Sequence, residues 1–296
     1  MKTLLALILG LALAGPALAQ TPPVQDAQDD GTVEGVVVTA PQKEMIEAFV
    51  ADVSEAAVGR DQLGRWDRKI CPGVTGLNPR YARFFNDRLA MAAFGVGLDV
   101  GEPGCRANIL IVMTDDGRRT AREIVRHNGR WMDKHNDEGT RGRRALKEFT
   151  ESTRPIRWWH VTHTVAEDGT PIIHDPEGPQ QITVRGTGRL HKGTTQNFHR
   201  MVIVVDFKAA GPVPLGALAD YVAMVALAQF DPKADTSRYP TILNLFADRA
   251  RGREAASGLT SWDKSYLAGL YGARREAPNV RTQQRDITRE MRRGGK

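Results

Sequence analysis

The histidines are the first residues to examine for metal chemistry, because imidazole is the commonest side-chain ligand of transition metals. The chain has seven histidines. His160 and His163 lie three residues apart in a segment typical of a β-strand. Side chains at that spacing point to opposite faces of a sheet, so the two rings are not expected to bind one ion. His174, His191 and His199 add no recognised ligand spacing, and we expect no metal site.

Other catalytic signatures are also missing from the sequence. It contains no Gly-x-Ser-x-Gly elbow, no Walker-type phosphate loop and no dinucleotide-binding glycine fingerprint. The remaining candidates for catalysis are Asp206, Asp220, His160 and His163. Asp220 lies in an apolar helical segment, where a carboxylate is costly unless it is paired, so we expect an ion pair with Arg or Lys from the neighbouring strands. A residual acid function is the alternative, and we expect neither enzyme activity nor a cofactor.

The N-terminal residues 1–19 have the pattern of a secretory signal peptide. Lys2 supplies the positive charge, an apolar run extends from Leu4 to Ala14, and Ala17-Leu18-Ala19 fits an A-x-A cleavage site. The apolar run is shorter than the roughly 20 residues of a spanning helix. We therefore expect a secreted protein in the periplasm of a Gram-negative bacterium, without a transmembrane helix after cleavage. That compartment argues against a nucleic-acid partner.

Cys71 and Cys105 are the two cysteines of the chain. An isolated pair in an oxidising compartment favours a disulfide over a metal or redox site, and the pair has no CxxC spacing. A bridge would close the segment 72–104 and contribute roughly 3 to 4 kcal/mol in the chain-entropy model. It would also leave no free thiol to act as a nucleophile.

The two ends of the mature chain differ in charge. Residues 20–42 hold four acids and no base, and their composition predicts a disordered acidic linker. Residues 274–296 hold eight bases and three acids and predict a flexible basic tail. This distribution assigns the basic character to one end of the chain and not to a recognition face. The tail could also contact an anionic envelope surface.

A short β-branched run interrupts the linker at residues 33–40. It contains Val36, Val37, Val38 and Thr39. The run resembles the TonB box of outer-membrane TonB-dependent receptors, a short Val-Val-Thr-containing strand near the mature N-terminus. In that family the strand adds to a sheet edge of the periplasmic domain of TonB. The resemblance implies a periplasmic protein partner through these four residues, and the alternative is an edge strand on the protein's own sheet.

The segment 43–273 is expected to form a single globular domain, with two lobes at 43–150 and 151–273 as the alternative. Apolar periodicity predicts helices over residues 43–58, 78–94, 118–131 and 213–230. Apolar and β-branched runs predict strands at 108–114, 156–165, 182–190 and 201–207. The charged stretch 133–147 is expected to be an exposed loop. The pattern predicts an α+β fold, a mixed sheet with packed helices.

Short motifs follow the strand at 201–207 in a specific order. The buried helix is followed by Pro240-Thr241-Ile242 and then by Leu259-Thr260-Ser261-Trp262-Asp263, a segment that runs to Leu270-Tyr271. This order resembles the catalytic half of zincin-like metalloproteases. It is more similar still to a group of secreted proteobacterial proteins of unknown function whose zincin-like domain ends in such motifs. The resemblance covers about residues 200–272 and implies a zincin-like C-terminal half.

The same resemblance implies that the metal site is degenerate. Zincins place two histidines at i and i+4 of a helix, a glutamate beside the first, and a third ligand further on. Those positions hold Asp220, Tyr221, Met224 and Phe230. Neither Met nor Phe is a zinc ligand here, and a tyrosine cannot replace the carboxylate base. We therefore expect a non-catalytic binding or structural domain. The alternatives are a metal-dependent hydrolase with atypical ligands and a partner of a TonB-type system.

Overall fold

The computed structural model describes residues 40–130, 132, 139–166, 172 and 192–294. The predicted signal peptide, the TonB-box-like residues 36–39 and the strand predicted at 182–190 lie outside the described residues. His174 and His191 lie outside them as well.

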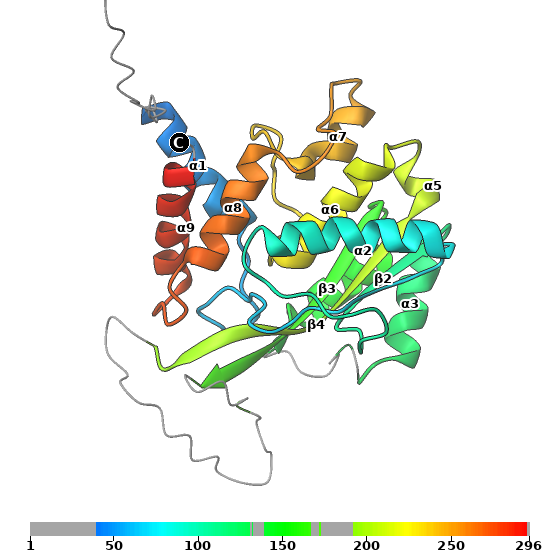
Figure 1. Cartoon of the computed structure of the whole chain (residues 1–296), viewed down its shortest axis with the longest axis horizontal. Helices are drawn as coiled ribbons and strands as arrows, with labels where there is room; N and C mark the ends of the chain where they lie inside the picture. Colours follow the sequence, from blue (N-terminus) through cyan, green and yellow to red (C-terminus); the bar gives the residue numbers. More distant parts are fainter. Residues whose placement is uncertain (1–39, 131, 133–138, 167–171, 173–191, 295–296) are drawn as a thin grey trace, which may run out of the picture. The chain divides into compact units, whose positions relative to one another are not determined.

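A mixed sheet forms the centre of the described part of the chain (Figure 1), with four strands in the order β1-β2-β4-β3. The parallel strands are β1 (Pro72–Thr75), β2 (Ile109–Thr114) and β4 (Thr194–Asp206), and β3 (Ile156–Ala166) pairs antiparallel with β4. Since β2 and β4 pair, one sheet joins the segments 43–150 and 151–273. The predicted α+β fold is confirmed.

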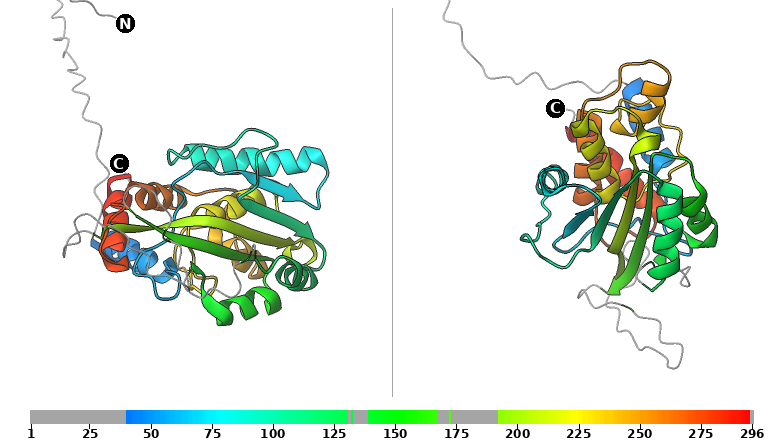
Figure 2. Two further views of the ribbon diagram at one scale, coloured as in Figure 1. Left: turned by 90° about the horizontal axis from the view of Figure 1, so that it is seen from below. Right: turned by 90° about the vertical axis from the view of Figure 1, so that its right-hand side faces the viewer.

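Helices cover both faces of the sheet (Figure 2), as the alternation along β4 requires. Ile203 and Val205 face one core, which also contains residues of α1 (Ala40–Val53), α2 (Pro79–Phe94), α6 (Leu215–Leu227) and α8 (Ser261–Gly272). Val202 and Val204 face a second core, formed with α3 (Gly117–His127) and α4 (Gly142–Glu151). The continuous apolar run of β4 is therefore buried on both sides.

Several predicted elements are found close to their expected bounds. α2 begins where Asn78 caps it, because the Asn78 side chain accepts a hydrogen bond from the Tyr81 amide and Pro79 occupies the first turn. β4 begins earlier than predicted, at Thr194, and α1 ends at Val53, before the 58 expected. The structure also contains the short elements α5 (Phe207–Ala210), η2 (Ile242–Asn244) and α7 (Leu245–Ala250).

The loop predicted at 133–147 is wrong where the structure describes it, because α4 begins at Gly142. Ala145 and Phe149 lie four residues apart and are buried against the sheet, where Phe149 contacts Trp159. Two apolar positions among many charges are enough to dock a short helix when a sheet offers an apolar face. The residues 133–138 lie outside the described ranges.

The flexible basic tail predicted at 274–296 is also wrong, because α9 (Val280–Gly294) is a helix packed against α8 and α1 (Figure 1). Ile287 and Met291 are buried in the main core. Arginines recur every four residues of α9 and face outward. Ile287 and Met291 therefore lie on the inner face of the helix. The folded domain thus extends past residue 273 to the end of α9.

The predicted disulfide between Cys71 and Cys105 is present, with Cα atoms 6.0 Å apart. It joins the residue before β1 to the loop before β2, and the segment that it closes contains α2. Among the residues described, no helix has the length and apolarity needed to cross a bilayer.

Candidate binding pocket around Arg88 and Asp220

Asp220 lies on the buried helix α6, and Arg88 of α2 satisfies its carboxylate. The side chain of Asp220 is 6% exposed and that of Arg88 is 32% exposed. Arg88 Nε donates to Asp220 Oδ1 at 2.7 Å, and Arg88 Nη2 donates to Asp220 Oδ2. The backbone amide of Leu259 donates to the same Oδ2 at 2.8 Å. The expected ion pair is present, but its cation comes from a helix and not from a neighbouring strand.

This ion pair lies at the side of a cavity of about 490 Å³ between α2, α6, α8 and the loop before α8. That volume falls within the usual range of small-molecule sites, roughly 300 to 1,000 Å³. Its apolar wall consists of Met91, Ala92, Val96, Leu259 and Leu267. Its polar residues are Arg88, Asp220, Ser257 and Lys264. We call this cavity the Arg88 pocket.

Gly258 lets the loop before α8 approach the ion pair. A Cβ at this position would lie 2.7 Å from Asp220 Oδ2. Such a separation is shorter than a van der Waals contact, so any larger residue would displace the loop or the carboxylate. The close approach allows the Leu259 amide to reach Asp220, and the loop and α6 therefore form one side of the pocket together.

Asp263 holds the two sequence motifs of this region together. Its side chain is fully buried and accepts hydrogen bonds from the Thr260 amide, the Thr260 hydroxyl and the Ile242 amide. Thr260 and Asp263 form a capping box at the start of α8. The Thr-x-x-Asp spacing is visible in the sequence, and its structural role is to fix the loop that borders the Arg88 pocket.

The other positions that the zincin resemblance assigns to metal chemistry are buried among apolar groups. Met224 and Phe230 belong to the main core. Tyr221 packs edge-on against Phe246, with ring centroids 5.2 Å apart. Burial raises the pKa of Tyr221 to about 12, so its hydroxyl stays protonated and cannot act as a base near neutral pH. Across the described ranges, no three His, Cys, Asp or Glu side chains are grouped to hold a metal.

His160 is a buried core residue. Its ring is 1% exposed and stacks on Phe198 at a centroid distance of 4.7 Å. Neither ring nitrogen makes a hydrogen bond of ordinary length. Burial, with Arg141 adding to the effect, lowers the pKa of His160 to about 3. The ring is therefore neutral at physiological pH.

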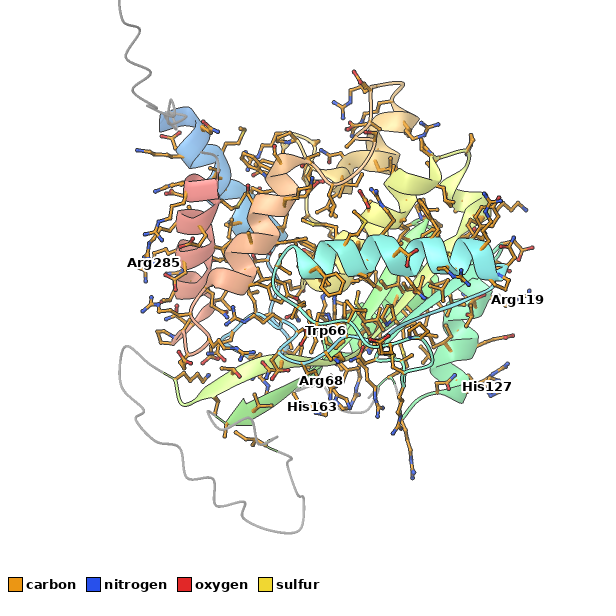
Figure 3. The ribbon with its side chains drawn as sticks, in the orientation of Figure 1. Trp66, Arg68, Arg119, His127, His163 and Arg285 are labelled. Atoms are coloured by element: carbon orange, nitrogen blue, oxygen red, sulfur yellow. A yellow bond between two sulfur atoms is a disulfide. The ribbon has the colours of Figure 1, made fainter. Side chains whose placement is uncertain are left out.

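His163 stacks on another histidine and does not join His160. The ring centroids of His163 and His199 are 4.0 Å apart. Arg68 Nη2 lies 3.0 Å from His199 Nδ1, and Figure 3 shows Arg68 and His163 at the same part of the sheet. Burial and the neighbouring His163, Arg200 and Arg68 lower the pKa of His199 to about 4. A register shift between Val161 and Thr162 separates the two candidate histidines along β3.

Asp206 has a structural role at the end of β4. Its Oδ1 accepts from the Ala209 amide and its Oδ2 accepts from the Gly117 amide, both at 2.9 Å. The carboxylate thus caps α5 and the first turn of α3, where an anion is stabilised by the unpaired amides. Both oxygens are occupied by backbone donors, so Asp206 does not join Asp220 in a site.

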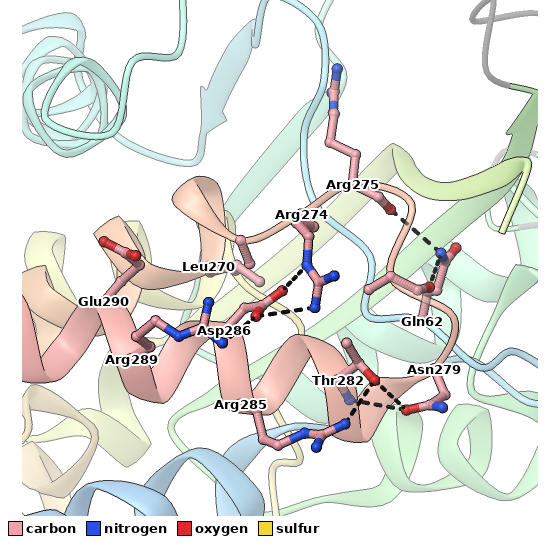
Figure 4. A network of polar contacts seen from close by, with 12 residues as sticks. Gln62, Leu270, Arg274, Arg275, Asn279, Thr282, Arg285, Asp286, Arg289 and Glu290 are labelled. Carbon is pink, nitrogen blue, oxygen red and sulfur yellow. Dashed lines mark hydrogen bonds and ion pairs between the residues drawn. The ribbon is translucent and has the colours of Figure 1, made fainter. Parts of the chain in front are cut away.

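The charge distribution along the sequence predicted that basic character is concentrated at the C-terminal end. The structure shows exposed basic side chains elsewhere as well. α3 and α4 also present exposed bases on the side opposite their buried residues: Arg118, Arg119, Arg122, Arg126, Arg143, Arg144 and Lys147. α9 presents a second set in one four-residue repeat: Arg281, Arg285, Arg289 and Arg293. Figure 4 shows that Arg274 pairs with the buried Asp286, while Arg285 donates to Thr282.

No protein-family model matches the sequence, and neither a curated protein nor a solved structure matches it significantly. The functional assignment therefore depends on the residues of the pocket. Arg88, Met91 and Lys264 are pocket residues that the sequence interpretation missed. The sequence does contain a signal that Arg88 lies near the core. Arg88 is next to Leu89 and one turn after Phe85, and these two residues of α2 are buried.

Proposed function

We propose that the protein is a secreted, non-catalytic binding domain on a zincin-like scaffold, with its ligand site in the Arg88 pocket. Three observations support the scaffold. β4 leads to α6 in the chain, α6 packs against β4 and α8, and the motifs at Thr241 and Asp263 bond to one another. These are the elements, in the same order, that carry the sequence resemblance.

The occupied carboxylate of Asp220 is the observation that carries the non-catalytic assignment. A zincin would place its first metal ligand at this position, but a guanidinium binds both oxygens here. A divalent cation at the same oxygens would face the positive charge of Arg88 at contact distance. The remaining positions offer Met224 and Phe230, which supply no ligand for zinc.

Metal content and hydrolysis test this assignment. The mature chain is purified without chelator, its zinc is measured by mass spectrometry, and its peptidase activity is measured on an unfolded protein substrate. We expect substoichiometric zinc and no hydrolysis. One tightly held zinc per chain, with hydrolysis lost in Asp220→Ala, would establish the alternative, a metal-dependent hydrolase. In that case the atypical ligands would be sought among Asp220, His160, His163 and Asp206.

Secretion to the periplasm of a Gram-negative cell is part of the proposal. Support comes from the signal-peptide pattern of residues 1–19 and from the disulfide, which persists in oxidising compartments. Fractionation of the cells and N-terminal sequencing test this location. We expect periplasmic protein that begins at Gln20. Cytoplasmic protein that retains Met1 would contradict it.

A second candidate function is contact with an anionic envelope surface through α9. The exposed arginine repeat of this helix favours it, because several bases on one surface add their attraction to anionic lipids. Cosedimentation with vesicles containing phosphatidylglycerol tests the contact. We expect binding that salt weakens and that is reduced in Arg285→Gln/Arg289→Gln. Equal binding to neutral vesicles would exclude the electrostatic contact.

A periplasmic partner of the TonB type remains a proposal that depends on Val36, Val37, Val38 and Thr39. The sequence run supports it, since extended β-branched segments add readily to exposed sheet edges. Binding of the mature chain to a TonB periplasmic domain is compared with binding of a chain that lacks residues 31–40. Unchanged binding after the deletion would remove this candidate.

A further inference from the structure

We infer that the Arg88 pocket binds a ligand with a single carboxylate on an apolar chain. The inference rests on the proposed binding function and names the class of ligand. Two properties of the pocket lead to it: a net positive charge at one side and an apolar wall that continues to the surface of α2.

The pocket keeps a net positive charge because its lining contains two cations, Arg88 and Lys264, and one carboxylate, Asp220. Its Oδ1 binds Arg88 Nε, and its Oδ2 binds Arg88 Nη2 and the Leu259 amide. Arg88 Nη1 donates to none of the described residues, and Lys264 on α8 has an exposed side chain without an ion-pair partner in the described chain. Two cations thus face the cavity with one satisfied carboxylate between the helices.

The bidentate pair fixes the orientation of the guanidinium. A planar guanidinium that is held along one edge presents its remaining N–H groups in a defined direction, which suits a carboxylate ligand. Asp220 is therefore a positioning residue for Arg88. The loop at Gly258 and Leu259 holds the carboxylate from the other side, so the donors are oriented before a ligand arrives.

The apolar wall accounts for the rest of the ligand. Met91 lines the pocket, and Phe94 follows one turn later on the same helix. They are 66% and 61% exposed, the two most exposed large apolar side chains of the described residues. Exposed apolar side chains grouped at a cavity are typical of ligand sites. An apolar chain that leaves the pocket over Met91 would cover them.

Other simple ligands fit this combination less well. A cation would be repelled by Arg88 and Lys264, and a small inorganic anion would leave the apolar wall uncovered. A neutral hydrocarbon would leave Arg88 Nη1 and Lys264 without an acceptor and would gain no charge-assisted hydrogen bond. A fatty acid and a peptide with an apolar free C-terminus both carry the required chemistry.

Calorimetric titration of the mature chain, residues 20–296, tests the inference. The probes are decanoate, decanol, acetate, and a Leu-Val-Leu peptide with either a free or an amidated C-terminus. We expect decanoate or the free peptide to bind. The matching neutral probe should bind at least about tenfold more weakly, as for loss of one charge-assisted hydrogen bond. Acetate should also bind at least about tenfold more weakly, because it buries no apolar chain. Binding of decanoate alone identifies a lipid source, and binding of the free peptide alone identifies a protein source.

Three variants connect the binding to this pocket. Met91→Asp places a negative charge, the same sign as the ligand carboxylate, on the apolar wall. Lys264→Gln removes a cation. Both positions are exposed, so both chains should fold. We expect binding to be lost in Met91→Asp and weakened several-fold in Lys264→Gln. Tyr81→Asp is the matched control, because Tyr81 is an exposed aromatic residue of α2 outside the pocket. Its binding should equal that of the parent chain.

The results separate this inference from the proposed function. If a chain without zinc and without hydrolysis binds neither carboxylate probe, or binds decanol as well as decanoate, the ligand class is wrong and the non-catalytic assignment stands. Equal losses in Tyr81→Asp and Met91→Asp would also overturn the inference. A zinc-dependent hydrolase that still binds decanoate through Met91 would overturn only the non-catalytic assignment.

Discussion

Gly269 of α8 and Ile287 of α9 are in contact at the level of the backbone. A Cβ added to Gly269 would lie 2.8 Å from the Ile287 carbonyl oxygen and 3.1 Å from the Ile287 Cγ2 atom. Two helices approach this closely only where one of them lacks a side chain. The contact makes α9 an integral part of the fold and places its basic residues on a rigid surface.

Gly269→Ala should therefore destabilise the protein. In an exposed helix interior this change adds up to about 1 kcal/mol of stability, because alanine favours the helix. Here the methyl group must push α9 away, and overpacking of that kind costs typically about 1 to 3 kcal/mol. Urea unfolding of both chains measures the net effect.

Gly216→Ala is the control for this experiment. Gly216 lies in the first turn of α6, and no heavy atom outside its own helix lies within 4 Å of an added Cβ. We expect unchanged or slightly increased stability there. A Gly269→Ala protein that is as stable as Gly216→Ala would contradict the packing of α9 on α8.

Arg88→Met should cost more stability than Asp220→Asn, because Asp220 is the more deeply buried partner. The first change leaves a buried carboxylate with one backbone donor, and such breaks cost roughly 3 to 5 kcal/mol when burial is complete. The second leaves a guanidinium that is one-third exposed and can bind water, so its cost should be smaller.

The double variant Arg88→Met/Asp220→Asn should recover most of the loss, since it leaves no unpaired charge in the core. Unfolding free energies of the two single variants, the double variant and the parent form a double-mutant cycle. If the two single changes cost the same and add in the double variant, the ion pair is not formed in solution.

Removal of the disulfide should lower the unfolding free energy without removing the fold. The cysteines are separated by 34 positions, for which the chain-entropy model gives roughly 3 to 4 kcal/mol. The comparison is between the parent chain and Cys71→Ser/Cys105→Ser in urea. The parent treated with reductant should match the double variant. A reduced parent that is as stable as the oxidised one would exclude the bridge.

The strongest local patterns were the parts of the fold that sequence could predict. α2 has an Asn78 cap, an early proline and a regular apolar stripe, and β2 and β4 are long apolar runs. α4 and α9 were missed because each docks through few apolar residues among many charges, such as Phe149 in α4 and Ile287 in α9. Composition therefore pointed to a loop and a tail, although the four-residue spacing was present.

The site was predictable in one respect. A carboxylate in an apolar helix needs a partner, and this requirement follows from local sequence alone. The identity of the partner does not, because Arg88 lies 132 positions from Asp220 and only the packing of α2 on α6 brings them together. The pocket wall at Met91 was unpredictable for the same reason.

The buried His160 should make the protein less stable in mild acid. Burial lowers its folded-state pKa to about 3, whereas an exposed histidine in the unfolded chain titrates near its ordinary value of about 6.5. Below the unfolded value, the unfolded state binds a proton that the native state does not, so stability falls as the pH falls from about 6.5 toward 3. Linkage gives a loss of about 2 kcal/mol between neutral pH and pH 5 from this residue.

His160→Phe should remove this contribution, because phenylalanine keeps the stacked ring against Phe198 and cannot titrate. Urea unfolding at pH 7 and pH 5 compares the variant with the parent, and the acid loss should be smaller in the variant. His127→Gln serves as the control for the loss of a histidine as such, because His127 is exposed on α3. If His160→Phe loses as much stability as the parent, the imidazole of His160 can accept a proton in the folded state and is not sealed within the core.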